Sequence, residues 1–153
     1  MKVLILGDIV GRPGRNFLKD QLEDFKQNNQ IELIIANGEN AAGGAGITAK
    51  TAKEVLGSGV DAITLGDHVW DQMNFNREID DLQYVCRPAN LPDSNPGRDR
   101  LIIEKGGLKI GIFTVLGRTF MGPKVSCPFQ TASKMVQDLD AQTDIIIAEI
   151  HAE

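Results

Sequence analysis

Short, continuously apolar runs alternate with amphipathic segments through the first half of the chain. Val3–Leu6 contains no polar position, which is typical of a strand buried on both faces, and two further strands with largely apolar centres are expected over residues 32–37 and 62–65. Between these runs, apolar residues recur at helical spacing over residues 17–25, and a second helix is expected over 48–56. This β-α-β-α-β order predicts a parallel sheet covered by helices.

The second half of the chain shows a different pattern. Two apolar runs, at residues 101–104 and 109–115, flank Gly106-Gly107, which is the signature of an antiparallel hairpin. A helix is then expected over residues 130–139, followed by a strand over 144–150. We therefore expect one α/β domain, with either a mixed parallel and antiparallel sheet or a second sheet.

Residues that bind metals or transfer protons follow four of these apolar runs. The chain has only two histidines, and both belong to this group. In open α/β sheets the carboxyl ends of parallel strands form the rim where ligands bind. Carboxylate, amide and imidazole groups at one rim can hold hard metal ions, and a bridging carboxylate can hold two ions about 3.5–4 Å apart. The candidate residues are Asp8, Glu39, Asn40, Asp67, His68 and His151.

Charge and composition narrow the range of partners. The net charge of −5 argues against bulk binding to nucleic acid or to an anionic membrane surface. No apolar run approaches the roughly 20 residues of a membrane-spanning helix, and no signal peptide is visible. Cys86 and Cys127 are isolated, as expected of reduced thiols. These features predict a cytoplasmic protein that acts on a small molecule.

Other interpretations of the same residues fit less well. Taken one at a time, Asp8 and the pair Glu39-Asn40 are ordinary caps or turn residues, and it is their recurrence at strand ends that favours a metal site. A dinucleotide site would need G-x-G-x-x-G after the first strand, whereas the chain has G-x-x-x-G-x-x-G. A serine esterase would need a nucleophile at position 9, which is Ile9.

The segments around the candidate residues resemble those of a known family, in register from the first residue to the last. They are Gly7-Asp8-Ile9-Val10-Gly11, Asn37-Gly38-Glu39-Asn40-Ala41-Ala42-Gly43-Gly44, Gly66-Asp67-His68-Val69-Trp70 and His151-Ala152-Glu153. In these segments the chain resembles the YmdB-like branch of the calcineurin-like metallophosphoesterases. The resemblance implies an α/β/β/α sandwich with a two-metal phosphodiesterase site, often containing iron. The resemblance also implies that the substrates are small phosphodiesters, and the best-known activity is hydrolysis of 2′,3′-cyclic nucleotides.

The resemblance also implies a role for each candidate residue. Asp8 would bind the first metal, Glu39 would bridge both metals, and Asp67 and His151 would bind the second. Most of the superfamily has Asp-x-His at the first strand, but Val10 holds that histidine position here, and Asn40 would fill the vacated place.

The implied chemistry is in-line attack on phosphorus by a hydroxide that two metal ions activate. His68 would be the general acid that protonates the leaving oxygen. Asp, Glu, Asn and His ligands suit iron, manganese and zinc alike, so the resemblance favours iron without excluding the other two.

Two departures from the family pattern shape the expectation. The branch usually has Gly-Asn-His where this chain has Gly66-Asp67-His68, and its later Gly-x-His-x-His segment is missing. We therefore expect residues 1–153 to form the N-terminal half of the sandwich, with the C-terminal portion absent. The alternative is an inactive fragment that serves as a regulatory or oligomerising metal-binding module. In either case an uncovered sheet would favour a homo-oligomer.

Overall fold

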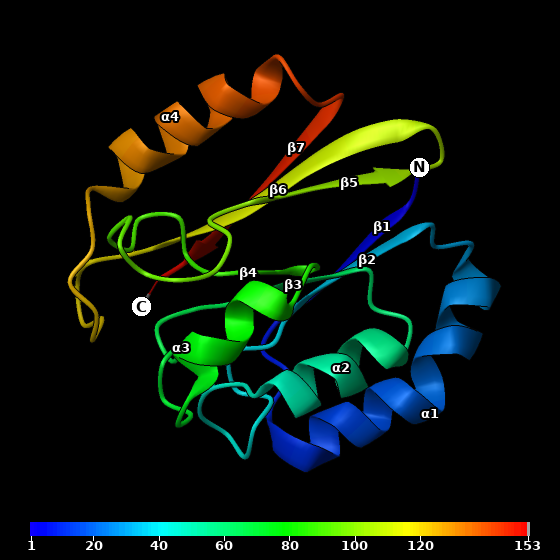
Figure 1. Ribbon diagram of the computed structural model, residues 1–153. Helices are drawn as coiled ribbons and strands as arrows, with labels where there is room; N and C mark the ends of the chain where they lie inside the picture. Colours follow the sequence, from blue (N-terminus) through cyan, green and yellow to red (C-terminus); the bar gives the residue numbers. More distant parts are fainter. Residues whose placement is uncertain (153) are drawn as a thin grey trace.

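Two stacked sheets form the centre of the molecule, as the computed structural model shows for residues 1–152 (Figure 1). Glu153, the last residue of the His151-Ala152-Glu153 segment, lies outside the described residues. In the described part, the first sheet is parallel throughout and has the strand order β1 (Val3–Leu6), β2 (Leu33–Asn37), β3 (Ala62–Thr64), β4 (Val85–Cys86). The second sheet has the order β5 (Leu101–Lys105), β6 (Leu108–Leu116), β7 (Ile145–His151).

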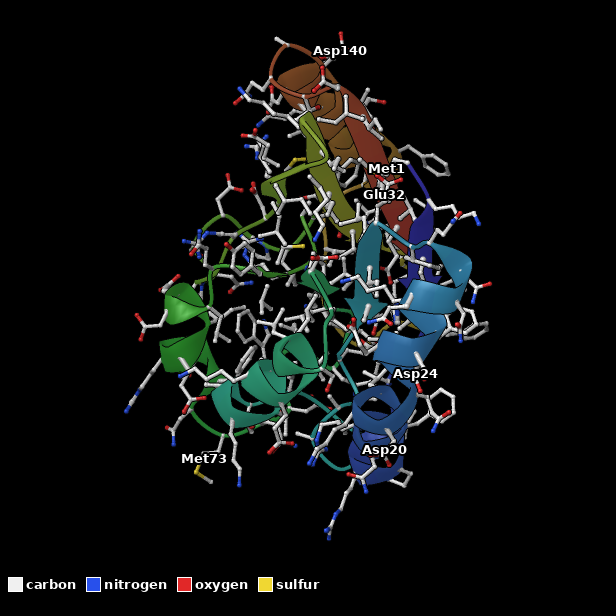
Figure 2. The ribbon with its side chains drawn as sticks, turned by 90° about the vertical axis from the view of Figure 1, so that its right-hand side faces the viewer. Met1, Asp20, Asp24, Glu32, Met73 and Asp140 are labelled. Atoms are coloured by element: carbon white, nitrogen blue, oxygen red, sulfur yellow. The ribbon has the colours of Figure 1, made fainter. Side chains whose placement is uncertain are left out.

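Helices cover the outer face of each sheet. α1 (Gly11–Asn29) and α2 (Ala49–Gly57) lie against the first sheet, and α4 (Pro128–Asp140) lies against the second (Figures 1 and 2). The short helix α3 (Phe75–Glu78) and the 3-10 turn Ile79–Asp81 precede β4. The layers thus follow the α/β/β/α order that the resemblance implied. Of the helices in residues 1–152, none is long and apolar enough to cross a membrane.

The apolar run of β2 is buried on both faces, as its sequence predicts. Leu33 and Ile35 face the second sheet, where they meet Ile110 and Ile112 of β6. The alternate residues of β2 pack instead under α1 and α2. The centre of the sandwich is therefore an apolar layer between the sheets, and it extends toward the ends of the strands that carry the candidate ligands.

β1 does not fit the expectation of a strand buried on both faces. Ile5 is 57% exposed and Val3 is 37% exposed, whereas every residue of β2 is buried. The reason is position: β1 is the edge strand of the first sheet, and in the described residues the second sheet does not cover its inner face. The apolar character of the run is real, but its burial depends on what lies opposite.

The predicted hairpin is present and orders the second sheet. Gly106 and Gly107 both have positive φ angles, of 59° and 76°, as a tight two-residue hairpin turn requires. β5 and β6 are antiparallel, while β6 and β7 are parallel with Leu116 opposite His151. The sheet is therefore mixed, and the end of β7 lies at the same end of the sandwich as the ends of β2 and β3.

Candidate metal centre

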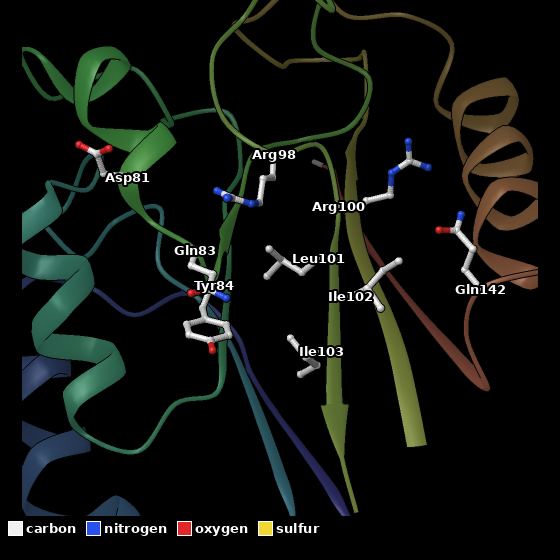
Figure 3. A pocket seen from close by; sticks show the side chains of 9 residues that line it. All are labelled: Asp81, Gln83, Tyr84, Arg98, Arg100, Leu101, Ile102, Ile103 and Gln142. Carbon is white, nitrogen blue, oxygen red and sulfur yellow. The ribbon is translucent and has the colours of Figure 1, made fainter. Parts of the chain in front are cut away.

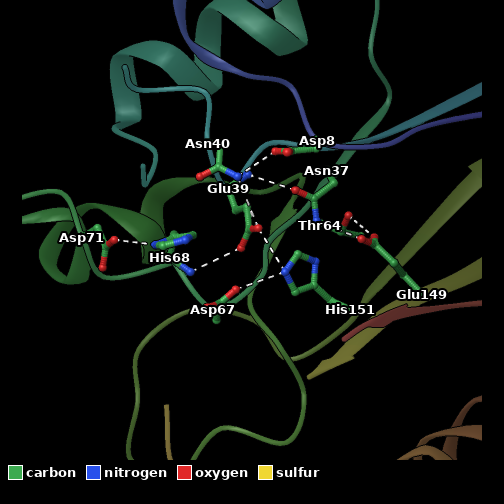
Figure 4. A network of polar contacts seen from close by, with 10 residues as sticks. All are labelled: Asp8, Asn37, Glu39, Asn40, Thr64, Asp67, His68, Asp71, Glu149 and His151. Carbon is green, nitrogen blue, oxygen red and sulfur yellow. Dashed lines mark hydrogen bonds and ion pairs between the residues drawn. The ribbon is translucent and has the colours of Figure 1, made fainter. Parts of the chain in front are cut away.

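Three of the predicted ligands converge where the two sheets meet. Glu39 follows β2, Asp67 follows β3, and His151 ends β7. One ligand atom from each lies within 4.8 Å of the other two. His151 Nε2 is 3.0 Å from Glu39 Oε1 and 3.1 Å from Asp67 Oδ1 (Figure 4). The ligands come from both sheets, so the cluster spans the rim of the sandwich instead of the edge of one sheet.

The charges of this cluster favour a cation. Glu39 is only 2% exposed, and a buried carboxylate is costly without a positive partner. The hydrogen bond to Glu39, helped by the charge of Glu39 and by Asp67, raises the pKa of His151 to about 9, although burial opposes the shift. Carboxylates that hold a proton on an imidazole at neutral pH also attract a metal ion, which displaces that proton when it binds.

Asp8 and Asn40 lie beside the cluster of Glu39, Asp67 and His151 and are joined to it through hydrogen bonds. Asn40 Nδ2 donates to Asp8 Oδ1 at 2.7 Å and lies 3.4 Å from Glu39 Oε1. Asp8 adopts a left-handed backbone conformation with φ of 32°, which is uncommon for a residue with a side chain and is often found at functional sites. The carboxylates of Asp8 and Glu39 thus lie on either side of the Asn40 NH₂ group, next to the first cluster.

Two observations show that the residues present suit a metal centre. Asn40 Oδ1 is buried and has no hydrogen-bond partner among the described residues, while the NH₂ group of the same amide faces the carboxylates of Asp8 and Glu39. Turning this amide by 180° would direct Oδ1 at a cation held by the two carboxylates and give it a positive partner. Any side chain at Gly66 would overlap Glu39 Oε2 and His151 Cε1, so a glycine is needed for these ligands to approach. Carboxylate, amide and imidazole groups are the donors that hard and borderline metal ions take in proteins.

His68 lies at the same rim but is held by a different partner. Its Nδ1 is 2.6 Å from Asp71 Oδ2, and its backbone N–H donates to Glu39 Oε2 at 3.3 Å. The hydrogen bond to Asp71 is the main cause of the raised pKa of His68. The His68 side chain remains 43% exposed. Asp71 was missed in the sequence, although its spacing of three residues from His68 was a usable signal.

A polar network behind the ligands was also missed. Asn37 and Thr64 are the last residues of β2 and β3, and both donate to the Glu149 carboxylate of β7 (Figure 4). Asn37 Oδ1 in turn accepts from the backbone N–H of Glu39 at 3.2 Å. A polar residue within an apolar strand was the available signal, but only the packing of the two sheets brings these residues together.

The glycine-rich segment after Glu39 is fastened to the same region. Gln72 Nε2 donates to the carbonyl oxygens of Ala42 and Ala45, at 3.2 and 2.6 Å. Gly46 has φ of 74°, and a side chain there would collide with Gln72. The segment therefore passes closely over the residues that follow His68, and it holds one wall of the site in place.

A sequence model of the YmdB-like protein family matches residues 4–153. The chain belongs to the YmdB-like family. It is 37% identical, over its full length, to the 2′,3′-cyclic-nucleotide 2′-phosphodiesterase of Bacillus subtilis (strain 168). A crystal structure of a novel phosphatase from Mycoplasma pneumoniae superposes on the whole chain with a TM-score of 0.89 at 33% identity.

More distant structures agree on the fold of this YmdB-like chain. A 5′-nucleotidase precursor from Thermus thermophilus matches 98% of the chain with a TM-score of 0.69, at 16% identity. The resemblance inferred from the sequence motifs and the metallophosphoesterase fold that it implied are thus confirmed. The chain spans 58% of the Bacillus subtilis relative and 56% of the Mycoplasma pneumoniae structure.

A separate hollow of about 520 Å³ lies away from the ligands of this YmdB-like chain, beside β5 and the segment that leads into β4 (Figure 3). It contains two arginines, but both already have partners. Arg98 donates to backbone carbonyl oxygens of Asp80 and Leu82, and Arg100 pairs with Asp99 and Asp138. The hollow shares no residue with the candidate metal centre.

Proposed function

We propose that the protein is a metal-dependent phosphodiesterase that hydrolyses small phosphodiesters, with 2′,3′-cyclic nucleotides as its substrates. The observation that carries the proposal is the convergence of Glu39, Asp67 and His151 with the neighbouring pair Asp8 and Asn40. The activity named for the Bacillus subtilis relative supports the choice of substrate class.

Two metal ions fit this arrangement, with Glu39 between them. Glu39 Oε1 lies near His151 Nε2 and near the Asn40 amide, so this carboxylate would reach both ions once the amide presents its oxygen. Asp8 and Asn40 would hold one ion, and Asp67 and His151 the other. Bound ions would neutralise the phosphoryl oxygens and lower the pKa of the attacking water. Iron is the proposed metal, and manganese or zinc would suit the same ligands.

Asp67 would alter this balance relative to the asparagine usual in the family. A second negative ligand beside Glu39 and His151 strengthens the attraction for a cation. It also reduces the net positive charge that an anionic phosphodiester would meet. We therefore propose tight metal binding together with weaker binding of the substrate phosphate.

His68 is the proposed general acid. Asp71 holds its Nδ1, which orients the ring and leaves Nε2 as the atom that would deliver a proton to the leaving oxygen. The partly exposed position of His68 at the rim would allow contact with a substrate. Its link to Glu39 passes through the backbone N–H, so the imidazole is not required as a ligand.

The test uses residues 1–153 joined to a C-terminal portion like that of the relatives, called the full-length protein from here on, and a 2′,3′-cyclic nucleotide. Metal is removed with a chelator, and iron, manganese and zinc are added back one at a time, with metal content and hydrolysis measured together. His151→Ala should lose both metal and hydrolysis, whereas Asp20→Asn on the exposed face of α1 should lose neither (Figure 2). Full hydrolysis by a metal-free sample would refute the proposal.

One feature favours a second candidate, a regulatory or oligomerising module. Phe120, Phe129 and Ile150 are 91%, 82% and 65% exposed, an unusual amount of apolar surface for these side chains. Such a module would bind metal without hydrolysing any phosphodiester. The same experiment separates the two candidates, because a full-length protein that binds metal stoichiometrically and stays inactive on the tested substrates supports the module.

A further inference from the structure

The carboxylate of Glu149 joins the two sheets directly behind the candidate metal centre. It projects from β7 and accepts a hydrogen bond from Asn37 Nδ2 at 2.8 Å and another from the Thr64 hydroxyl. We propose that Glu149 is a positioning residue, which fixes the Asn37 side chain and through it the backbone of Glu39. The inference rests on the proposed function, because Glu39 is taken as a metal ligand.

The hydrogen-bonding capacity of each group determines this arrangement. An ionised carboxylate can only accept, so Glu149 requires Asn37 to present its NH₂ group to the second sheet. The Asn37 Oδ1 must then point toward its own chain, where it accepts from the N–H of Glu39, two residues later, at 3.2 Å. This bond from a side chain to the N–H two residues later is an Asx turn, and it sets the direction in which the chain leaves β2.

The location of Glu149 explains why such a device is needed. Glu39 comes from the first sheet and His151 from the second, so the distance between these ligands depends on how the two sheets are stacked. Deeper in the sandwich the sheets meet through aliphatic side chains, and such contacts are not directional. The network of Asn37, Thr64 and Glu149 adds directional bonds at the end of the sheets that carries the ligands.

Asp61 provides a matched control. Its carboxylate also links the two sheets, because it accepts from Lys105 Nζ of β5 at 2.6 Å and from the Ile34 N–H of β2 at 2.9 Å. It precedes β3, whereas the candidate ligands follow β2 and β3, so this link lies at the opposite end of the first sheet. Loss of Asp61 removes a comparable inter-sheet bond without touching the path to Glu39.

The experiment measures the dissociation constant of Mn²⁺ in the full-length protein by calorimetry, at a temperature where each variant is folded. Glu149→Ala should raise it by roughly ten- to hundredfold, the usual effect of losing a group that orients a metal ligand. Asp61→Ala should lower the melting temperature without changing the constant. Asn37→Ala should match Glu149→Ala, and the double variant should be no worse than either single variant.

Glu149→Gln distinguishes geometry from charge. Its carbonyl oxygen can still accept from Asn37, and its NH₂ group can donate to the Thr64 hydroxyl, which serves as donor or acceptor. It should therefore bind Mn²⁺ nearly as well as the wild type. If Glu149→Gln is as weak as Glu149→Ala, or if Asp61→Ala weakens binding equally, the positioning role is wrong.

A readout without metal keeps this inference separate from the proposed function. Hydrogen exchange of the Glu39 amide, followed by nuclear magnetic resonance in metal-free protein, should be faster in Glu149→Ala and unchanged in Asp61→Ala. Unchanged exchange in Glu149→Ala would overturn the inference even if wild-type protein binds Mn²⁺. If the wild type fails to bind Mn²⁺, the proposed function fails, while the exchange data still decide the role of Glu149.

Discussion

The two oxygen atoms of Glu39 contact different groups, which makes this residue central to the candidate metal centre. Oε1 lies 3.0 Å from His151 Nε2 and 3.4 Å from Asn40 Nδ2, and Oε2 accepts from the His68 N–H at 3.3 Å. Asp8 has fewer contacts, because among residues 1–152 its carboxylate is hydrogen-bonded to this group through Asn40 alone. A carboxylate between two groups of ligands is suited to serve two ions.

Glu39→Gln should therefore lose more metal than Asp8→Asn. Removing the charge of a bridging ligand weakens both ions, whereas Asp8→Asn should weaken one of them. Metal stoichiometry per chain, measured by elemental analysis of the full-length variants, gives the answer. Asp20→Asn serves as the control for loss of an exposed carboxylate charge on α1. Equal losses for Glu39→Gln and Asp8→Asn would mean that Glu39 binds a single ion.

His68→Ala should keep its metal and lose turnover. We expect a drop of roughly 10²–10⁴-fold in kcat on a cyclic nucleotide, the usual contribution of a positioned general acid. The loss should shrink for a p-nitrophenyl phosphodiester, because its leaving group needs little protonation. Asp71→Asn should show a smaller loss with the same dependence on the leaving group, since the ring stays in place. Metal loss in His68→Ala would identify His68 as a ligand.

The sequence showed the candidate ligands more readily than the residues that support them. Asp8, Glu39, Asp67 and His151 could be picked out because each follows an apolar run and each carries a side chain with metal-binding chemistry. Glu149 could not, since it meets Asn37 and Thr64 across 112 and 85 positions of sequence. Such contacts form only when the two sheets pack together, so no local sequence pattern predicts them.

The helix α2 begins with a capping box that follows the glycine-rich segment. The Thr48 hydroxyl accepts from the Thr51 N–H at 3.1 Å, and the Thr51 hydroxyl accepts from the Thr48 N–H at 2.9 Å. These bonds satisfy backbone N–H groups that the first turn of a helix leaves unpaired. The cap thus fixes the point where the segment over the site becomes helix.

Thr48→Ala should lower the free energy of unfolding by about 1 kcal/mol, the typical cost of losing a threonine cap. Denaturant titration of the full-length protein measures this change. Thr48→Ser is the matched control and should stay close to the wild type, because its hydroxyl caps the helix equally well. Metal affinity should be the same in all three proteins, and a weakened affinity in Thr48→Ala would show that the cap also shapes the site.

Long periodic elements could be predicted from the sequence, whereas very short elements and the burial of the edge strand β1 could not. The strands β2, β3 and β7 and the hairpin around Gly106-Gly107 lie within a residue or two of the expected ranges. β4 has only two residues and α3 only four, too few to show a period. The prediction that β1 is buried on both faces was wrong. Its burial depends on the opposite sheet, and the residues of the strand itself carry no information about that sheet.

Two exposed apolar surfaces lie on different sides of the sandwich. One lies between β1 and α1, beside Leu4 and Leu6, where Phe17 is 67% exposed. The other lies between β7 and α4, where Phe129 and Ile150 are 82% and 65% exposed. β1 and β7 are also edge strands of their sheets in the described residues, and exposed edges can pair with another chain.

These surfaces lead to a prediction for a protein made of residues 1–153 alone: it should self-associate and hydrolyse cyclic nucleotides poorly. Association would bury the apolar side chains beside β1 and β7, which cost free energy in water. Poor hydrolysis is expected because the family's Gly-x-His-x-His segment is not among these residues. The resemblance implies that this segment supplies a histidine to each metal.

Size-exclusion chromatography with light scattering and a cyclic-nucleotide assay measure both properties, with the full-length protein as the control. A stable monomer that hydrolyses the substrate as fast as the full-length protein would contradict the prediction. It would mean that Asp8, Glu39, Asn40, Asp67 and His151 suffice as ligands.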